Sequence, residues 1–277
     1  MLSRRRRRPP AGALVECRYT APEGAFITTP TLHVRHGGDG EPSLLLVHGL
    51  GANGDVWNGL HDVLTERWRG RWVIPDLPGH GKSSPLPRYS FGQLAAAVAP
   101  TVASAARVVV LGHSLGGVVA LALASGWFGV KISAVCGLGI KVSWTDEELV
   151  RAQALSVRPP SRYPARGEAA ERYLKLAGLA GLVAPDAVGD AALLHGDDGW
   201  TVAFDPAAFA VGAPDMAGLL GASQARVMLA AGEHDPMCTE DQLRKLVPDP
   251  VILPGLGHNA HVESPDALWP LLERLTS

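Results

Sequence analysis

A serine flanked by glycines is the first residue of this sequence that could do chemistry. Gly112-His113-Ser114-Leu115-Gly116 follows the apolar run Val108–Leu111 and opens the run of small and branched residues Gly116–Ala124. A buried strand, a sharp turn and a helix would place the Ser114 hydroxyl above a sheet and at a helix N-terminus, where amides favour developing negative charge. We therefore predict that Ser114 is a nucleophile. A Gly/Ser turn without chemistry is the alternative.

A serine hydroxyl is a weak nucleophile and needs a base, which in turn needs an orienting acid. At a strand–serine–helix turn of this kind the chain order is serine, acid, histidine. His258 lies in a loop that contains glycine and directly follows the predicted last strand, Val251–Leu253. We predict that His258 is the base, with its neighbour His261 as the rival.

The acid is expected in a loop after the preceding strand. That strand is predicted at Arg226–Ala231, and the loop after it reads Gly232-Glu233-His234-Asp235-Pro236. Asp235 is the predicted acid, and Glu233 is the alternative. A serine, a histidine and a carboxylate in these roles would carry out acyl transfer.

Acyl transfer also needs backbone amides directed at the oxyanion, each worth about 3 kcal/mol. One amide should come from Leu115, the residue after the nucleophile. The second should come from the loop His48–Gly51, which follows the predicted strand Ser43–Val47, and Leu50 is the predicted donor. His48 is interpreted as a structural histidine bonded to the backbone of this loop.

These residues need a sheet whose strands end side by side. Apolar runs without polar alternation are typical of parallel strands covered on both faces, and alternating strands and helices predict an α/β fold. The predicted strands are Leu14–Tyr19, Thr31–Arg35, Ser43–Val47, Trp72–Ile74, Val108–Leu111, Ile132–Cys136, Arg226–Ala231 and Val251–Leu253. The predicted helices between and after them are Val56–Trp68, Phe91–Ser104 (bent or ended early by Pro100), Gly116–Ala124, Leu243–Leu246 and Ala267–Leu275.

Residues 139–215 interrupt the alternation. No clear strand is found there, and predicted helices such as Glu147–Ala154 and Glu168–Ala177 are separated by prolines. An insertion of this length is typical of a functional lid. We predict a core domain of residues 13–138 and 216–277 and a helical cap of residues 139–215. Three aromatic residues of this cap could line a substrate pocket or form the cap's own core: Trp144, Tyr163 and Trp200.

Composition restricts the class of protein. Hydrophobic residues make up 47% and charged residues 19% of the 277 residues, which indicates a large buried core. Without the run Arg4–Arg8, 20 basic residues stand against 27 acidic ones, so the remainder carries about −7 and is a poor nucleic-acid binder. Residues 1–12, which contain that run, are predicted to be a disordered basic tail.

Neither a signal peptide nor a membrane span is expected. Glu16 interrupts the apolar residues after the arginines, and glycines break the uncharged segment Val108–Val130. The three cysteines have an odd count and no metal-binding spacing, which is typical of reduced thiols in a cytoplasmic protein. We expect a cytoplasmic monomer or homodimer that acts on a small molecule.

Taken in order, five motifs resemble those of the α/β-hydrolase superfamily, in its serine-nucleophile, esterase-like branch. They are His48–Gly51, Asp76–Ser83, Gly112–Gly117, Gly232–Asp235 and Gly257-His258. The resemblance covers the chain from about residue 30 to its end. It implies an eight-stranded, mostly parallel sheet, a helical cap over the active site, and neither a metal nor an organic cofactor. It also implies that Asp76–Ser83 is structural, and Ser114 excludes the relatives that use an aspartate nucleophile, haloalkane dehalogenases and soluble epoxide hydrolases.

Three functions remain open from the sequence. The first is hydrolysis of a carboxylic ester or lactone of a small to medium apolar substrate through an acyl-enzyme. The second keeps the triad for another reaction, such as C–C bond hydrolysis or a menaquinone-type synthase. The third is a non-catalytic ligand receptor on a hydrolase fold, against which the complete triad argues.

Overall fold

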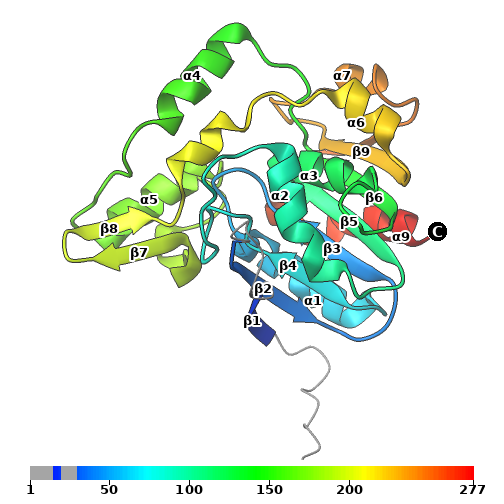
Figure 1. Ribbon diagram of the computed structural model, residues 1–277, viewed down its shortest axis with the longest axis horizontal. Coiled ribbons are helices and arrows are strands. Elements are labelled where there is room, and N and C mark those ends of the chain that lie inside the picture. The colour runs from blue at the N-terminus through cyan, green and yellow to red at the C-terminus, as the bar shows by residue number, and fades with distance from the viewer. Residues whose placement is uncertain (1–14, 20–29) are drawn as a thin grey trace, which may run out of the picture.

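The computed structural model describes the backbone of residues 15–19 and all of residues 30–277. The predicted basic tail of residues 1–12 lies outside the described residues. Eight strands form one sheet in the order β1-β2-β4-β3-β5-β6-β9-β10 (Figure 1). Their bounds are β1 Val15–Tyr19, β2 Leu32–Gly37, β3 Ser43–Val47, β4 Trp72–Pro75, β5 Val108–His113, β6 Ile132–Leu138, β9 Arg226–Gly232 and β10 Val251–Leu253. The predicted eight-stranded sheet is confirmed.

Strand direction explains where a site can form. β1 and β2 pair antiparallel, as do β2 and β4, whereas every pair from β4 to β10 is parallel. The carboxyl ends of β3, β5, β6, β9 and β10 therefore lie at one edge of the sheet. In open α/β sheets ligands bind outside this edge, so the loops after these strands are the ones that can meet there.

Helices cover both faces of the sheet, as the uniformly apolar strands predict. In β3 alternate residues serve the two faces, since Leu45 packs in one hydrophobic cluster and Leu46 in the other. The first cluster includes residues of α2 (Phe91–Val98), α3 (Leu115–Ala124), α6 (Met216–Ala222) and α7 (Glu240–Arg244). The second includes residues of α1 (Asn58–Arg67), α8 (Ala260–Glu263) and α9 (Trp269–Thr276).

Two helix boundaries follow local signals. The predicted helix Phe91–Ser104 ends at Val98 and continues only as a short 3₁₀ turn that contains Pro100, in agreement with the expected early end. The predicted helix Leu243–Leu246 is displaced, because α7 begins at Glu240. A capping box at Thr239 satisfies the first amides of α7 and starts the helix there.

Residues 139–215, here called the cap segment, lie together on one side of the sheet in Figure 1. They contain α4 (Asp146–Ser156), α5 (Arg166–Leu176) and an antiparallel hairpin of β7 (Leu193–Gly196) and β8 (Gly199–Val202). The expectation that this segment contains no strand is wrong. Each strand has four residues, too few to show an alternating pattern, although the Asp197-Asp198-Gly199 turn is a hairpin signal.

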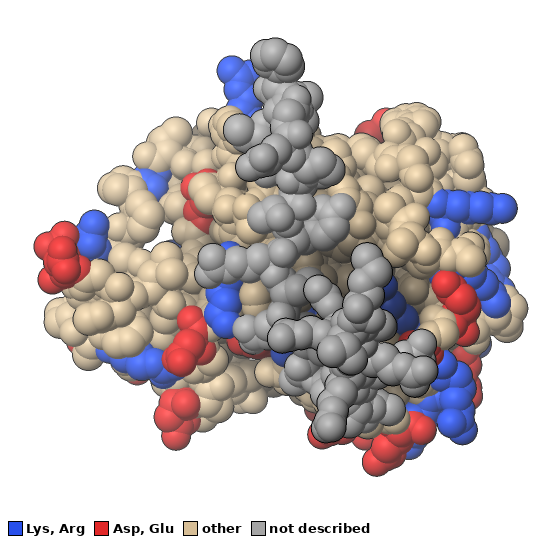
Figure 2. Space-filling view, turned by 60° about the horizontal axis from the view of Figure 1, so that its bottom comes forward, with Lys and Arg blue, Asp and Glu red and all other residues tan. Residues whose placement is uncertain are grey.

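Two surface properties follow from this arrangement. Within residues 15–19 and 30–277, none of the helices has the length and apolarity needed to cross a membrane. The uncharged segment Val108–Val130 is instead divided between β5, a turn and α3. On the face shown in Figure 2, Lys and Arg are interspersed with Asp and Glu, and the described residues form no continuous basic stripe there.

Candidate active site

Ser114 occupies a strained turn between β5 and α3. Its φ of 51° and ψ of −116° make it the one non-glycine residue with positive φ among those the structure describes. Such a conformation costs about 1–3 kcal/mol and persists only where the surroundings impose it. A Cβ on Gly112 would lie 2.2 Å from the carbonyl oxygen of Gly116, and a Cβ on Gly116 would lie 2.2 Å from that of Val47. The glycines of the motif are therefore needed for close backbone packing.

His258 and Asp235 lie together, as the sequence predicts. His258 Nδ1 is 2.9 Å from Asp235 Oδ2, a distance at which Nδ1–H donates to the carboxylate. The other oxygen of Asp235 accepts a 2.8 Å hydrogen bond from the Met237 amide, and the Asp235 side chain is fully buried. The alternative acid, Glu233, is exposed and accepts instead from the Gly255 amide at 2.8 Å.

The rival base, His261, has no access to this site. Its ring is buried, and neither nitrogen has a hydrogen-bond partner among the described residues. Burial, together with the charges of His258 and His48, lowers the pKa of His261 to about 3. A buried, neutral histidine that does not line the cavity of Ser114 is a packing residue.

His113 supports His258, a contact that the sequence analysis did not identify. His113 Nε2 is 2.9 Å from the His258 carbonyl oxygen, and the two rings are 4.7 Å apart between centroids. Burial lowers the pKa of His113 well below its usual value, so the ring is neutral and can donate Nε2–H. His113 therefore holds the loop of His258 against the turn of Ser114. No spacing rule in the sequence reveals a contact between side chain and backbone across 145 residues.

The loop that contains Leu50 comes close to the Ser114 turn. A Cβ on Gly49 would lie 2.9 Å from His113 Nδ1 and 3.3 Å from Ser114 Cβ, so a glycine allows this approach. Leu50 and Leu115 both line the cavity that contains Ser114. The two predicted amide donors are thus brought to one site.

His48 fixes the start of this loop, as interpreted from the sequence. Its Nδ1 lies 2.8 Å from the Gly49 carbonyl oxygen, and its Nε2 accepts a 2.8 Å hydrogen bond from the Leu77 amide. Burial lowers the pKa of His48 and keeps the ring neutral, so Nε2 can act as this acceptor.

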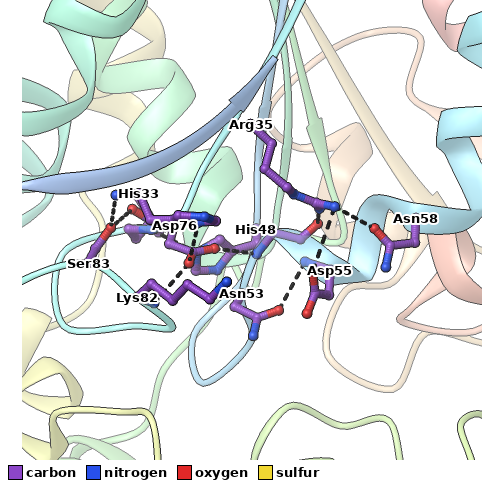
Figure 3. Close-up of polar contacts among 11 residues, drawn as sticks. His33, Arg35, His48, Asn53, Asp55, Asn58, Asp76, Lys82 and Ser83 are labelled. Carbon is purple, nitrogen blue, oxygen red and sulfur yellow. Dashed lines mark hydrogen bonds and ion pairs between the residues drawn. The ribbon is translucent and has the colours of Figure 1, made fainter. Parts of the chain in front are cut away.

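A buried polar network joins the same loop to the end of β4 (Figure 3). Asp76 Oδ1 accepts from the Gly54 amide at 2.7 Å, and Oδ2 accepts from the Lys82 amide at 3.0 Å and lies 3.2 Å from His33 Nδ1. Burial alone would raise the pKa of Asp76, but the hydrogen bonds from His33, Lys82 and Gly54 outweigh it and lower the pKa. Asp76 is structural, as the resemblance implies.

Arg35 completes the network from β2. Its guanidinium donates to the Gly54 carbonyl oxygen and, at 2.7 Å, to Asn58 Oδ1, and it lies 3.7 Å from Asp55 Oδ1. Asn53 caps the following turn by accepting from the Asp55 amide at 2.9 Å. Charged hydrogen bonds thus determine the position of the chain just beyond Leu50.

Replacing Asp76 with Asn should lower the free energy of unfolding at pH 7 by about 2–4 kcal/mol. The reason is that the buried carboxylate which accepts from the Gly54 and Lys82 amides and pairs with His33 loses its charge. The pKa of Asp76 is lower in the folded than in the unfolded state, where carboxyls titrate near about 3.9. Its stabilisation is therefore complete above that pH and is lost as the pH falls through the folded pKa.

Urea unfolding of the two proteins at pH 7 and in acid measures this effect. Asp62→Asn is the matched control, since the Asp62 side chain is 90% exposed and its loss should change little. Equal stability of wild type and Asp76→Asn at pH 7 would contradict the structural role.

Ser114, His258, Leu50 and Leu115 line one cavity of about 340 Å³. Its walls are mostly apolar and include Phe91, Val118, Trp144, Leu176, Val211 and Met237. Trp144 lines this cavity, which is one of the two possibilities that the sequence left open for it. Most of the other wall residues come from separate elements and carried no recognisable pattern.

Two other predicted substrate residues, Tyr163 and Trp200, do not line this cavity. Their backbones pair with each other through two 2.8 Å hydrogen bonds. The Trp200 ring packs on His195 at 4.6 Å and under Arg166 at 6.0 Å. Of the two possibilities left open for these aromatics, their contacts favour packing within the cap segment over a place in the cavity of Ser114.

Among the described residues, no group of three or more His, Cys, Asp or Glu side chains is placed to hold a metal ion. In the neutral tautomer of His258 whose Nδ1–H donates to Asp235, Nε2 carries no proton and can accept one.

Known proteins resemble this chain over parts of its length. A pimeloyl-[acyl-carrier protein] methyl ester esterase of Aeromonas hydrophila is 45% identical over 86 residues, 30% of this chain and 32% of that protein. Uncharacterized protein Rv2715 of Mycobacterium tuberculosis is 40% identical over 111 residues, 35% of this chain and 32% of that protein. These matches span about a third of the length of the curated relatives.

Solved structures share the fold over nearly the whole chain. A thioesterase domain from the curacin biosynthetic pathway covers 96% of this chain and 100% of its own, with a TM-score of 0.75 and 19% identity. E-2-(acetamidomethylene)succinate hydrolase covers 95% of this chain and 99% of its own, with a TM-score of 0.76 and 22% identity. The model of the alpha/beta hydrolase family matches residues 44–271. With this match across most of its length, the chain belongs to the alpha/beta hydrolase family.

Proposed function

We propose that this protein is a serine hydrolase that cleaves a carboxylic ester of a small to medium, largely apolar substrate through an acyl-enzyme. The main support is one arrangement. A histidine hydrogen-bonded to a buried carboxylate, His258 with Asp235, lines the same cavity as Ser114 on its strained turn. The esterase names of relatives such as the Aeromonas hydrophila protein agree with an ester substrate.

The reaction begins when Ser114 Oγ attacks the ester carbonyl carbon and His258 Nε2 takes the hydroxyl proton. The amides of Leu50 and Leu115 stabilise the oxyanion, and Asp235 stabilises the imidazolium that forms. His258 then gives its proton to the leaving alcohol as the C–O bond breaks. The product of this half-reaction is an ester of Ser114.

Water completes the cycle. His258 Nε2 takes a proton from a water molecule, whose oxygen attacks the acyl carbon. Collapse of the second tetrahedral intermediate breaks the bond to Ser114 Oγ, which regains its proton from His258. The carboxylic acid leaves, and the free serine is restored.

Two measurements on the wild-type protein test this proposal. Hydrolysis of 4-nitrophenyl acetate and butyrate should be catalytic, and a fluorophosphonate should add once, at Ser114, as shown by intact mass and peptide mapping. The butyrate tests whether the apolar cavity accepts an acyl chain.

Ester turnover and fluorophosphonate labelling, taken together, distinguish a serine esterase from the other functions that the sequence left open. A protein that neither hydrolyses these esters nor reacts with the fluorophosphonate would contradict a serine hydrolase. Labelling of Ser114 without ester turnover would keep the nucleophile and contradict the ester substrate, as expected for C–C bond cleavage or a menaquinone-type synthase.

A further inference from the structure

Two lysines line the cavity that contains Ser114. They are Lys141, which follows β6, and Lys175, which lies on α5. None of the residues that line this cavity is Asp or Glu. The lining histidines, His113 and His258, cannot balance the two charges, since a histidine side chain is either neutral or positive. Most of the residues that line this cavity are therefore apolar, and the lining residues that carry a full charge, Lys141 and Lys175, are positive.

The two ammonium groups differ in environment. The Lys141 side chain is only 17% exposed, its Nζ pairs with the more exposed Glu148, and it lies 4.7 Å from the Trp144 ring centroid. Lys175 is exposed and has no ion pair with any other described residue. Lys141 is thus held in place at the cavity, while Lys175 is free to pair with a ligand.

A site of this composition selects for a particular kind of molecule. Apolar walls favour a hydrocarbon chain, and the unpaired ammonium group of Lys175, with Lys141 nearby on the same cavity and no carboxylate in its lining, attracts an anion. A lysine acts as a compact point charge and pairs with carboxylate or phosphate, whereas two like charges repel a cationic ligand. A neutral ester matches the apolar walls but leaves Lys175 without an anionic partner.

We infer that the substrate is an ester with an apolar chain that ends in an anionic group, carboxylate or phosphate, and that Lys175 and Lys141 bind this group. The inference rests on the proposed ester hydrolysis and adds the chemical class of the substrate. It makes the two lysines specificity residues, which determine which ester is cleaved.

A matched pair of substrates tests the charge preference. Mono-4-nitrophenyl suberate and 4-nitrophenyl octanoate have acyl chains of equal length and differ only in a terminal carboxylate or methyl group. The suberate should have a kcat/KM about tenfold higher, as expected for two partly exposed ion pairs. Because exposed charges are screened, the ratio should fall in high salt.

Product-like inhibitors distinguish the two anions. Octanoate, octyl phosphate and 1-octanol are compared as competitive inhibitors of 4-nitrophenyl butyrate hydrolysis. Tighter inhibition by octanoate than by octyl phosphate assigns a carboxylate, and the reverse order assigns a phosphate. If neither anion inhibits more strongly than 1-octanol, the inference is overturned.

Lysine variants test whether Lys175 and Lys141 cause the preference for the suberate over the octanoate. Lys175→Gln and Lys141→Gln should each lower the suberate-to-octanoate ratio about threefold, and the double variant should bring it near one. Lys131→Gln is the matched control, because Lys131 is exposed and precedes the opposite end of β6. It removes the same charge and should keep the wild-type ratio.

The failure of this inference differs from a failure of the proposed function. A wild-type protein that hydrolyses both esters with equal kcat/KM retains the function and overturns the inference. A ratio that persists in the double variant overturns the role of the lysines. If no ester is hydrolysed, titration calorimetry with octanoate, octyl phosphate and 1-octanol still measures the preference for an anion.

Discussion

Replacing Ser114 with Ala should lower kcat for 4-nitrophenyl butyrate by roughly four to six orders of magnitude. The reason is that the acyl group then has no acceptor, while Leu50, Leu115 and His258 stay in place. The substrate still fits the cavity, so its KM should change far less than kcat. The rate measured with purified wild type and variant at equal concentration tests this directly.

Two further variants make the result specific to the turn. Ser156→Ala, on exposed helix α4, removes a hydroxyl outside the cavity and should keep full activity. Ser114→Gly should be as inactive as Ser114→Ala but more stable than it by about 1–2 kcal/mol, because glycine adopts positive φ without strain. Residual turnover of Ser114→Ala above about a tenth of wild type would exclude Ser114 as the nucleophile.

Replacing Asp235 with Asn should lower kcat about 10⁴-fold with little loss of folding. The amide of Asn can donate to Nδ1 of His258, which would stabilise the tautomer with the proton on Nε2 and remove the base. The side chain keeps its size, and the Met237 amide keeps an acceptor, so the melting temperature should stay near that of wild type.

Glu233→Gln is the matched control for the acid. Glu233 lies two residues earlier in the same loop, is exposed and contacts the Gly255 amide rather than His258. Its loss should change kcat by less than about twofold, as for a surface residue away from the chemistry. If Glu233→Gln and Asp235→Asn lowered kcat equally, the carboxylate on His258 would not be the one that the hydrogen bond indicates.

Much of the fold follows from local patterns. The runs Ser43–Val47 and Val108–Leu111 are apolar at every position, a pattern that strands covered on both faces produce. The turn of Ser114 is equally local, because glycines at fixed positions around it meet the needs of one tight backbone turn. Asp235 and His258 could be chosen because each follows a recognisable strand of the parallel sheet.

Local sequence patterns do not predict elements or contacts that depend on residues far apart in the chain. The hairpin Leu193–Val202 is too short for its own periodicity to show, and it is ordered by packing on α5 and by its turn. Tyr163 and Trp200 have the size and apolarity of pocket residues, yet their backbones pair with each other away from the residues that line the cavity of Ser114. Sequence spacing does not distinguish an aromatic residue that lines a cavity from one that packs beside it.

The sequence by itself therefore determined the sheet, the serine turn and the choice of Asp235 and His258 as its partners, because each depends on a few adjacent residues. Only the tertiary structure decided that His113 supports His258 and that two lysines line the cavity of Ser114. These contacts join elements separated by tens of residues or more. They exist only because folding brings the carboxyl ends of parallel strands and the cap segment to one place.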